Sequence, residues 1–324
     1  MKQFDIPILL EFYARPEKFL KVFDSVKAMK PAILFLYQDA PKSENDKAGW
    51  AKCREIVNSI DWPCDIHTYY QEQNKGCDPS GFLAQSWFFD NVEFGIVLED
   101  DCVPNCSFFY FCREMLIKYK DDNSIAFISG MNVLDKFRNP KCPEADYFFT
   151  AHGGIWGWAT WKRFYMLCDP TYSWLNNKND IKAIKDNFYS KREGNSFIKL
   201  AKARQKEKKE YFETIVYSNA RLHNQVEIVP CVNLISNIGI GELGTHGPGS
   251  IEKLPPRIRK LFFKETFEIP NLITHPILKE RNYKYEAKIK PSIFDGIMFK
   301  IYSLRYYLTA KRRDKGIRQD NLEK

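Results

Sequence analysis

The sequence predicts an α/β protein whose mostly parallel sheet is flanked by helices. Over the first 130 residues, short apolar runs of strand length alternate with segments of helical periodicity, and the connections between them are short. The chain has 324 residues, of which 44% are hydrophobic and 28% charged. This length is enough for one large α/β domain or two ordinary ones with a sizeable core. No apolar run is long enough for a membrane span.

The strands and helices can be placed in order along this first part. Five strands are predicted, at residues 6–13, 32–39, 64–71, 94–98 and 124–130. Helices are predicted between them, at residues 16–29, 43–60, 79–91 and 108–119. In the first helix, Phe19, Phe23 and Val26 recur at helical spacing, and Pro16 is well suited to a first turn. Ser43 precedes acidic residues and is typical of a helix cap.

The second half of the chain is organised differently. Residues 151–166 are rich in Gly and Trp, and their tryptophans read as large hydrophobic residues at the start of a helix. Residues 176–212 predict solvated helices, and apolar runs of strand type resume at 226–249. Pro and Lys become more frequent after residue 250. The sequence therefore predicts one domain at 1–250 and a basic, helical C-terminal extension at 251–324.

Polar residues follow each of the first four predicted strands. They are Arg15, Asp39, Asn74 and the acidic triplet Glu99, Asp100 and Asp101. The carboxyl ends of parallel strands lie at one edge of a sheet, and ligands of such folds bind there. We therefore expect these side chains to converge on one ligand site.

The acidic triplet at the end of an apolar strand indicates a metal site. Mg²⁺ and Mn²⁺ prefer oxygen ligands and need only one or two protein carboxylates when a substrate diphosphate supplies the rest. Alternation along the strand projects Glu99 and Asp101 to the same side. The alternative is an exposed acidic turn without a ligand.

At this point the sequence resembles a known family. The segments IPILLEFYARPE, LFLYQDAPKS, NKGC and GIVLEDDCVPNCSFFYF are similar to those of GT-A fold glycosyltransferases, in the nucleotide-diphospho-sugar transferase superfamily. The resemblance covers roughly residues 5–250 and is closest to a bacterial group that looks like N-acetylglucosaminyltransferase I. The block EDD-x-x-P-x-x-x-F-F is its most specific part, and the WGWATW and NLISNIGIG blocks are typical of the bacterial group. It implies a Rossmann-like GT-A domain.

The resemblance also implies roles for the residues at the strand ends. Asp101 would bind Mn²⁺ or Mg²⁺, Asp100 would contact the ribose, and Glu99 the donor sugar. Arg15 would lie near the nucleotide, and Asp39 would accept a hydrogen bond from a uracil N–H. Each of the last two has a plainer reading. Arg15 can be a surface arginine before a proline, and Asp39 an acid of a turn.

Two further residues take their roles from the resemblance. His246, in the sequence GTHGPG, stands where many such enzymes place a histidine near the metal or diphosphate. Trp156 is a candidate for contact with the donor or acceptor sugar, because aromatic faces line sugar clefts. Trp158 and Trp161 are assigned to the core. A loop histidine without a ligand and a core tryptophan are the alternatives.

The catalytic base is the point at which the chain departs from the family. The similar enzymes are inverting and use an Asp in a W-D-x-x-W-like segment, whereas EYFETIVYSNARL offers Glu213 after a Phe. Glu is longer by one methylene, which moves the carboxylate by about 1 Å or more. We expect Glu213 to be the base, with Asp169 and Glu210 as weaker candidates.

The charge distribution bears on partners and location. The net charge is +8, and residues 293–324 carry eight Lys or Arg against four Asp or Glu. The pattern at 293–313 is typical of an interfacial helix on an anionic membrane, and a helix packed on the domain is the alternative. Nucleic acid is not an expected partner. Nine cysteines without a zinc-type spacing indicate reduced thiols, and with them a cytoplasmic protein, peripheral at the inner membrane face if the tail binds lipid.

The expected activity is metal-dependent, inverting transfer of a hexosyl or N-acetylhexosaminyl group from a UDP-sugar to a saccharide hydroxyl. A lipid-linked saccharide is a candidate acceptor, with a capsule or O-antigen as the surface glycan. Two alternatives remain open. A nucleotidyltransferase of related fold normally has a Gly-rich, Lys-containing loop after the first strand, and this chain has EFYARPEKF there. A catalytically inactive module that binds a sugar or nucleotide is the other.

Overall fold

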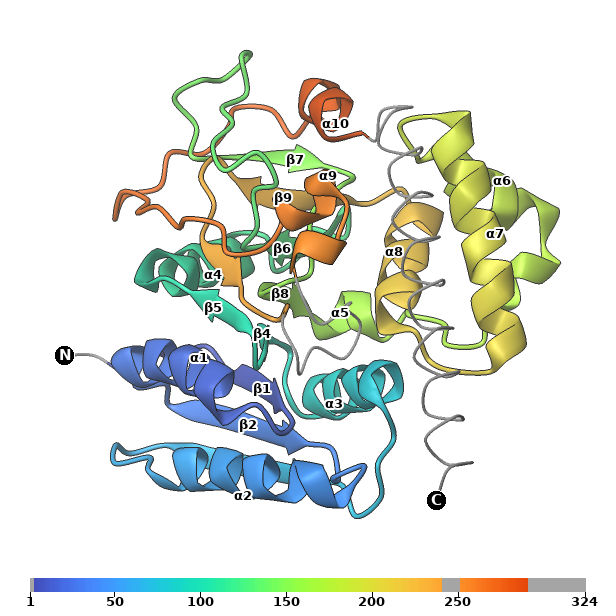
Figure 1. Ribbon diagram of the computed structural model, residues 1–324. Helices are drawn as coiled ribbons and strands as arrows, with labels where there is room; N and C mark the ends of the chain where they lie inside the picture. Colours follow the sequence, from blue (N-terminus) through green and yellow to red (C-terminus); the bar gives the residue numbers. More distant parts are fainter. Residues whose placement is uncertain (1–2, 241–250, 291–324) are drawn as a thin grey trace.

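The computed structural model describes residues 3–240 and 251–290 (Figure 1). An eight-stranded sheet forms the centre in the order β3-β2-β1-β4-β8-β6-β9-β7. The first four strands are all parallel, whereas β8 and β7 run against their neighbours. The predicted α/β class with a mostly parallel sheet is confirmed.

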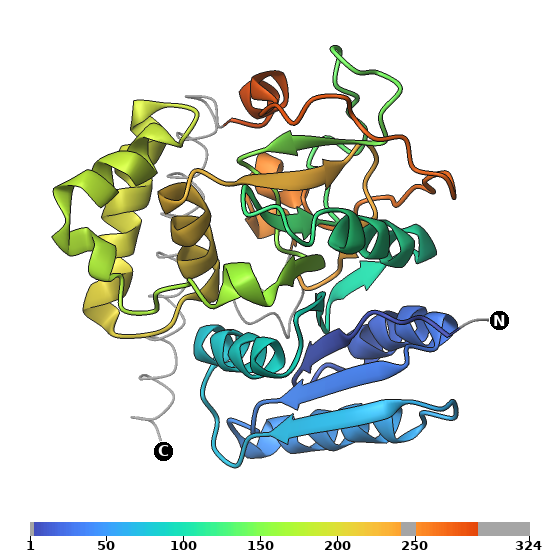
Figure 2. The ribbon, with the colours of Figure 1, turned by 180° about the vertical axis from the view of Figure 1, so that it is seen from behind.

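The strands of the sheet are short and mostly buried. Their bounds are β1 Ile8–Phe12, β2 Ile33–Gln38, β3 Asp65–Tyr70, β4 Phe94–Glu99, β6 Ile125–Ser129, β7 Tyr147–Thr150, β8 Trp158–Trp161 and β9 Val226–Pro230. A separate antiparallel pair is formed by β5 Cys102–Pro104 and β10 Ile235–Asn237. Figure 2 shows β1, β2 and β3 side by side from behind. All five predicted strands of the first part are present; four are shorter than their apolar runs, and β4 extends one residue beyond its run, to Glu99.

Helices cover both faces of the sheet. Their bounds are α1 Pro16–Met29, α2 Glu44–Asn58, α3 Cys77–Asn91, α4 Cys106–Lys118, α5 Lys162–Tyr165, α6 Lys178–Asp186, α7 Lys191–Glu207, α8 Phe212–Leu222, α9 Pro256–Arg259 and α10 Tyr283–Ile289. Pro16 opens α1, and Ser43 forms a capping box with Asp46 at the start of α2, as their residue types predict.

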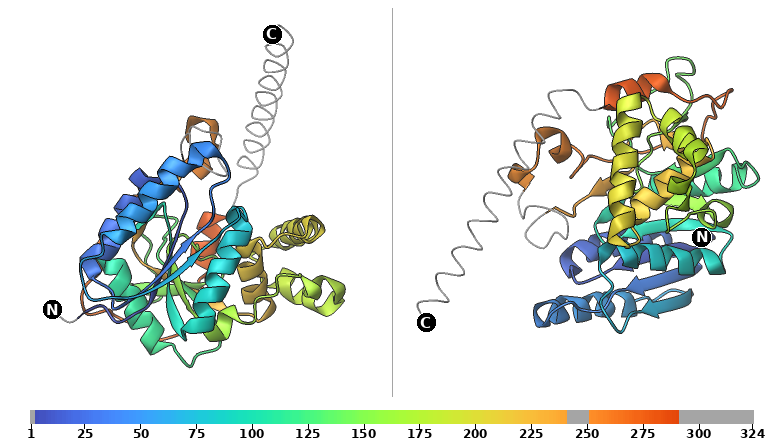
Figure 3. Two further views of the ribbon diagram at one scale, coloured as in Figure 1. Left: turned by 90° about the horizontal axis from the view of Figure 1, so that it is seen from below. Right: turned by 90° about the vertical axis from the view of Figure 1, so that its right-hand side faces the viewer.

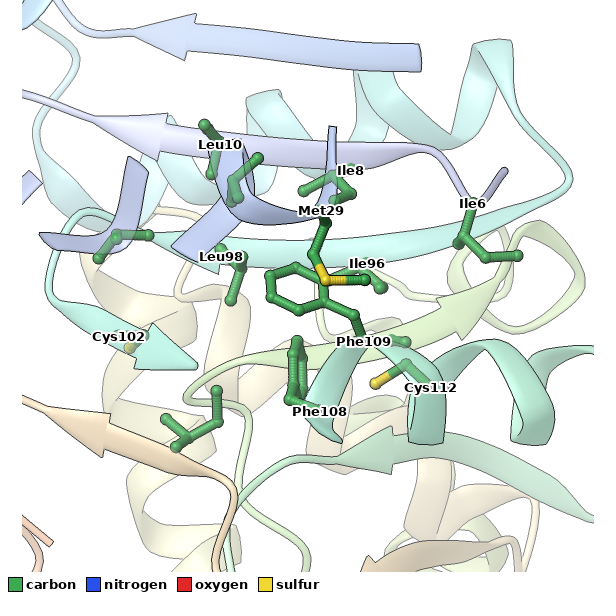
Figure 4. Packing of buried hydrophobic residues seen from close by; sticks show 14 of the residues in the cluster. Ile6, Ile8, Leu10, Met29, Ile96, Leu98, Cys102, Phe108, Phe109 and Cys112 are labelled. Carbon is green, nitrogen blue, oxygen red and sulfur yellow. The ribbon is translucent and has the colours of Figure 1, made fainter. Parts of the chain in front are cut away.

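The alternating side chains of β1 divide the core into two layers. Ile8 and Leu10 face α1 and α4, where Phe108 and Phe109 pack against them together with Met29 (Figure 4). Leu9 instead belongs to the layer under α3, α5 and α8. Because side chains alternate along a strand, a strand covered on both faces reads as a continuous apolar run.

The Gly- and Trp-rich segment corrects one expectation. Trp158–Trp161 form the strand β8, which is inserted antiparallel between β4 and β6, and the short helix α5 begins only after them, at Lys162. Both tryptophans are almost fully buried, so their assignment to the core is confirmed. Gly157, at φ +62°, supplies the left-handed turn before the strand, and a Cβ there would lie 2.4 Å from Ile235 Cδ1.

Helices α6 and α7 stand at the side of the molecule, beyond α8 (Figure 3). They have their own cluster of buried side chains, which includes Trp174, Ile184 and Ile198 and meets α8 at Ile215. The two helices agree with the solvated helices predicted at 176–212. The segment that contains α6 and α7 contributes no strand to the sheet.

The described part of the C-terminal segment packs on the sheet. Arg281 pairs with Phe149 of β7 in an isolated bridge, and Tyr285 of α10 is fully buried against Phe148 and Val229. The predicted boundary near residue 250 remains a prediction. Within the described residues, no helix is long and apolar enough to cross a membrane. The basic stretch at 293–313 lies outside them.

Candidate functional site

Arg15 forms ion pairs with two of the acids at the end of β4, Asp100 and Asp101. Its guanidinium pairs with Asp100 through both Nε and Nη2, and its Nη1 lies 2.8 Å from Asp101 Oδ2. Tyr13 N also donates to Asp100 Oδ2 at 3.2 Å. These side chains are largely buried, so the charges are little screened by water. Arg15 therefore supplies the positive charge that two of the three adjacent carboxylates require.

Asp101 is held from a second direction by the chain after β10. Asn237 Nδ2 donates to Asp101 Oδ1 at 3.3 Å, and Ile238 N donates to the Asp101 carbonyl at 2.8 Å. Gly239 passes so close that a Cβ there would lie 2.2 Å from Asp101 Oδ2. Lys18 Nζ donates to the Gly239 carbonyl at 2.8 Å. This contact brings a second cation beside the acids.

Asp39 and Asn74 are brought together as the strand-end pattern predicts. Asn74 Nδ2 donates to Asp39 Oδ2 at 3.0 Å and to the Ala40 carbonyl at 2.7 Å. The buried Asp39 carboxylate also accepts from the main-chain N–H groups of Ala40, Lys75 and Gly76. These contacts join the loops after β2 and β3. They fit the reading of Asp39 as a turn acid, and its expected contact with a base remains a prediction.

Tyr13 connects the two groups of strand-end residues. Its N–H reaches Asp100, while its carbonyl accepts from Gln38 Nε2 at 2.8 Å. Gln38 directly precedes Asp39 and is the last residue of β2. The four predicted features thus lie along one edge of the sheet, at the carboxyl ends of β1, β2, β3 and β4.

A row of glutamates lies beside this edge. Glu99 is the last residue of β4, and its register partner on β1 is Glu11. Burial, followed by the charges of Asp101, Glu11 and Glu213, raises the pKa of Glu99 well above its usual range. Burial is also the main cause that raises the pKa of Glu11 to about 8. The exposed Glu213, at the first turn of α8, therefore lies within electrostatic reach of Glu99.

The loop that carries Trp156 is anchored by a buried ion pair. Arg221 Nη1 lies 2.7 Å from Glu227 Oε1, and Gly153 N donates to Glu227 Oε2 at 2.6 Å. Tyr217 Oη donates to the Gly153 carbonyl at 2.8 Å. Trp156 itself is half-buried and packs on Phe262, with ring centroids 5.1 Å apart.

The position of Trp156 relative to the acids follows from its neighbour. Phe262 forms a bridge with Asn237, the residue that holds Asp101. Trp156 is therefore three contacts from the acidic triplet, through Phe262 and Asn237. The expected contact of Trp156 with a sugar remains a prediction.

The carboxylates of the triplet could hold a hard divalent cation only if a bound ligand supplied further oxygen atoms to the same ion. Among the described residues, no three His, Cys, Asp or Glu side chains are placed to hold one ion. The three acids of the triplet lie beside two cations, Arg15 and Lys18, so the carboxyl groups outnumber the cations. An ion held by Asp101 and a diphosphate is consistent with that imbalance. The expected ligand His246 lies outside the described residues.

The weaker candidates for the base differ from Glu213. The Asp169 carboxylate accepts from the main chain of Thr171 at 2.8 Å and of Ser173 at 2.5 Å, which closes a local turn. These two hydrogen bonds hold the Asp169 carboxylate in a local turn, which makes it a weaker candidate for the base. Glu210 lies just before α8, three residues from Glu213. Glu213 is among the main charges that raise the pKa of Glu99.

Sequence reasoning missed two residues of this edge. Glu11 interrupts the apolar run ILLEF, and an acid inside a buried strand is a signal that could have been used. Lys18 had no such signal, because a lysine in the first turn of an amphipathic helix is ordinary. Its approach to residue 239 depends on how the distant β10 segment packs.

Comparisons with known proteins add little. Neither a protein-family model nor a curated protein matches the chain. Among solved structures, HddC from Yersinia pseudotuberculosis is similar at 9% identity over 49% of this chain and 77% of its own, with a TM-score of 0.30. The 4-diphosphocytidyl-2C-methyl-D-erythritol synthase from Anaerococcus prevotii matches at 10% identity over 49% and 74%, with a TM-score of 0.29. Similarity at this level identifies neither a family nor an activity for this chain.

Proposed function

We propose that the protein is a metal-dependent, inverting glycosyltransferase that moves a sugar from a UDP-sugar to a hydroxyl of a saccharide. The observation that carries the proposal is the convergence of Arg15, Lys18 and the acidic triplet at the carboxyl edge of four parallel strands. Cations and metal-binding carboxylates at such an edge are suited to a nucleotide diphosphate. The family resemblance of the EDD block supports the same reading.

The residues would divide the reaction between them. Arg15 and Lys18 would offset negative charge on the departing diphosphate. Asp101 would hold Mn²⁺ or Mg²⁺, and the ion when bound would neutralise the same oxygens. Glu99 would orient the donor sugar, and Glu213 would take the proton of the attacking hydroxyl.

The metal and nucleotide part of the proposal is tested with Asp101→Asn. This variant keeps the shape of the side chain and removes its charge, so Mn²⁺-dependent binding of UDP should be lost in isothermal titration calorimetry. Asp61→Asn is the matched control, because within residues 3–240 and 251–290 the side chain of Asp61 forms an exposed ion pair with Lys27 and lies outside the site. Unchanged Mn²⁺-dependent binding of UDP by Asp101→Asn would remove the triplet from the nucleotide site.

The base is tested with Glu213→Gln. Removal of a general base lowers turnover by roughly 10²- to 10⁴-fold, while UDP affinity should stay within a factor of about two. Turnover is read as UDP release from a panel of UDP-sugars with saccharide acceptors. Equal turnover in the variant and the parent protein would exclude Glu213 as the base and return attention to Asp169 and Glu210.

The same assays separate the two alternatives. A nucleotidyltransferase would bind UTP with Mg²⁺ and release pyrophosphate when a sugar phosphate is added. An inactive module would bind UDP or a UDP-sugar in a manner that depends on Asp101, and would release no UDP with or without an acceptor. UDP release that requires a saccharide acceptor supports transfer.

A surface glycan, built on a lipid-linked acceptor at the inner membrane face, is the setting proposed for the reaction. The support is the basic, amphipathic sequence at 293–313. Flotation of the full chain with vesicles that contain anionic lipid tests it, with a chain ending at residue 290 as the control. Equal flotation of both chains would contradict a membrane role for the tail.

A further inference from the structure

Two carboxylates face each other across β1 and β4 on the side of the sheet that α3 covers. Glu11 and Glu99 are register partners at the carboxyl ends of neighbouring parallel strands. Neighbouring strands lie about 4.8 Å apart, so the two side chains project side by side. Both residues remain partly exposed, so a ligand at the sheet edge can reach them.

Gln85 of α3 adds a buried amide to this pair of glutamates. The side chain is fully buried, and its Nε2 donates to Glu11 Oε1 at 3.0 Å. Its other polar atom, Oε1, has no hydrogen-bond partner among the described residues. Both atoms belong to one planar amide, so the unpartnered end lies next to the Glu11 carboxylate. If the amide is turned over, a polar end is still left without a partner.

The surroundings favour an occupant that donates hydrogen bonds and carries positive charge. Arg15 pairs with Asp100 and Asp101 rather than with the two glutamates. On the other side of Glu11, its register partner Tyr37 is buried and closes that side. A buried acceptor without a donor costs free energy, and in the absence of a cation burial favours the protonated form of Glu11. A ligand with N–H donors and a positive charge would satisfy the acceptor and favour the ionised carboxylate.

We propose that Glu11, Glu99 and Gln85 form a subsite for a protonated primary amine on the transferred sugar. An ammonium group has three N–H donors and one positive charge, which match two carboxylates and one amide oxygen. A hydroxyl has a single donor and no charge. An acetamido group has one N–H and adds an acetyl group beside two carboxylates. The inference rests on the proposed function, because it assumes that the sugar is carried on UDP.

The test compares three donors that differ at one position. Binding of UDP-glucosamine, UDP-glucose and UDP-N-acetylglucosamine is measured by calorimetry with Mn²⁺, near pH 7, where the amine is largely protonated. UDP-glucosamine should bind at least tenfold more tightly than the other two. Glu11→Gln should abolish that preference and leave UDP affinity unchanged. Gln85→Met should reduce the preference, and Glu44→Gln, an exposed acid of α2, is the matched control.

A second readout separates this inference from the proposed function. Free glucosamine is titrated into the isotope-labelled full chain, and chemical-shift changes are followed with and without Glu11→Gln. Shifts that depend on Glu11 support the amine subsite even if UDP does not bind. If UDP binds with Mn²⁺ but neither amine shows a Glu11-dependent effect, the inference is overturned and the proposed function stands. If neither UDP nor amine binds, both are overturned.

Discussion

Arg15 explains how the chain tolerates three consecutive acids. One guanidinium spans Asp100 and Asp101, and its planar fork matches two carboxylates at once. Glu99 points to the other face of the strand and lies with Glu11 instead. The three acids of the triplet therefore have different partners. Two acids have a fixed cation, and the third belongs to a separate acidic pair.

Removal of the guanidinium should destabilise the protein. Breaking a buried ion pair by deleting one partner costs roughly 3–5 kcal/mol, because a buried charge is left alone. We expect Arg15→Met to lose that order of unfolding free energy in urea titrations. Lys27→Met, which removes the exposed pair with Asp61, should lose less than about 1 kcal/mol. Equal losses in the two variants would contradict the role given to Arg15.

Glu11 makes stability depend on pH. Its pKa is raised from 4.5 to about 8, chiefly by burial. Between these values the folded protein keeps a proton that the unfolded chain has lost. The free energy of unfolding therefore falls as pH rises through this window, by up to about 1.4 kcal/mol per unit. Below pH 4.5 both states bind the proton, so the slope disappears and the stabilising contribution is fully present; it is lost as pH rises through about 8.

The substitution Glu11→Gln should remove this slope. Urea denaturation at pH 5, 6, 7 and 8 should show the variant gaining stability relative to the parent protein as pH rises. Glu44→Gln serves as the exposed control and should follow the parent protein at every pH. Parallel curves for Glu11→Gln and the parent protein would show that Glu11 does not hold the proton.

At the scale of elements, the connections after the strands position the site. The link from β1 to α1 is only three residues long, so Arg15 is placed directly by the end of the strand. The longer loops after β2 and β3 are held instead by Asp39, which accepts from the main chain of both. Asp39 thus fixes the position of residues 74–76 at the start of α3.

Asp39→Asn should loosen the start of α3. An amide accepts weaker hydrogen bonds than a carboxylate, and its NH₂ group would face N–H donors. Each such lost contact is worth about 1–3 kcal/mol, so a loss of about 2 kcal/mol overall is expected. The measurement is urea unfolding, with amide exchange at residues 74–76 as the local readout. Asp65→Asn on the exposed edge strand is the control, and equal exchange rates in both variants would contradict the prediction.

At the scale of the whole molecule, the sheet and the α6–α7 pair form separate packing units. Two buried layers cover the two faces of the sheet, whereas α6 and α7 meet the rest mainly through α8 (Figure 3). Because sub-regions open with free energies that follow their buried contacts, the units should differ in local stability. The helical pair should be the weaker one.

Native-state hydrogen exchange tests this difference. Amides of α6 and α7 should exchange at lower denaturant than those of β1 and β4, which are buried on both faces. The helix α8 should fall between, since Ile215 joins the outer cluster and Val216 the sheet. Exchange of all these segments at one denaturant concentration would mean that the molecule unfolds as a single cooperative unit.

The sequence by itself determined the α/β class, the strands β1 to β4 and β6, and the edge at which polar side chains gather. Apolar runs, helical spacing and caps such as Ser43 act between near neighbours, so the local pattern is sufficient for them. The meeting of Asp39 with Asn74 also followed, because parallel strands end at one edge.

Only the tertiary structure decided which charges pair and which segment completes the edge. The strand at Trp158–Trp161 could not be recognised, because its place between β4 and β6 comes from antiparallel pairing with distant strands. Arg15 lies 85 positions from Asp100, and Asn237 lies 136 from Asp101. Contacts across such separations depend on how whole elements pack, and no local pattern along the chain carries that information.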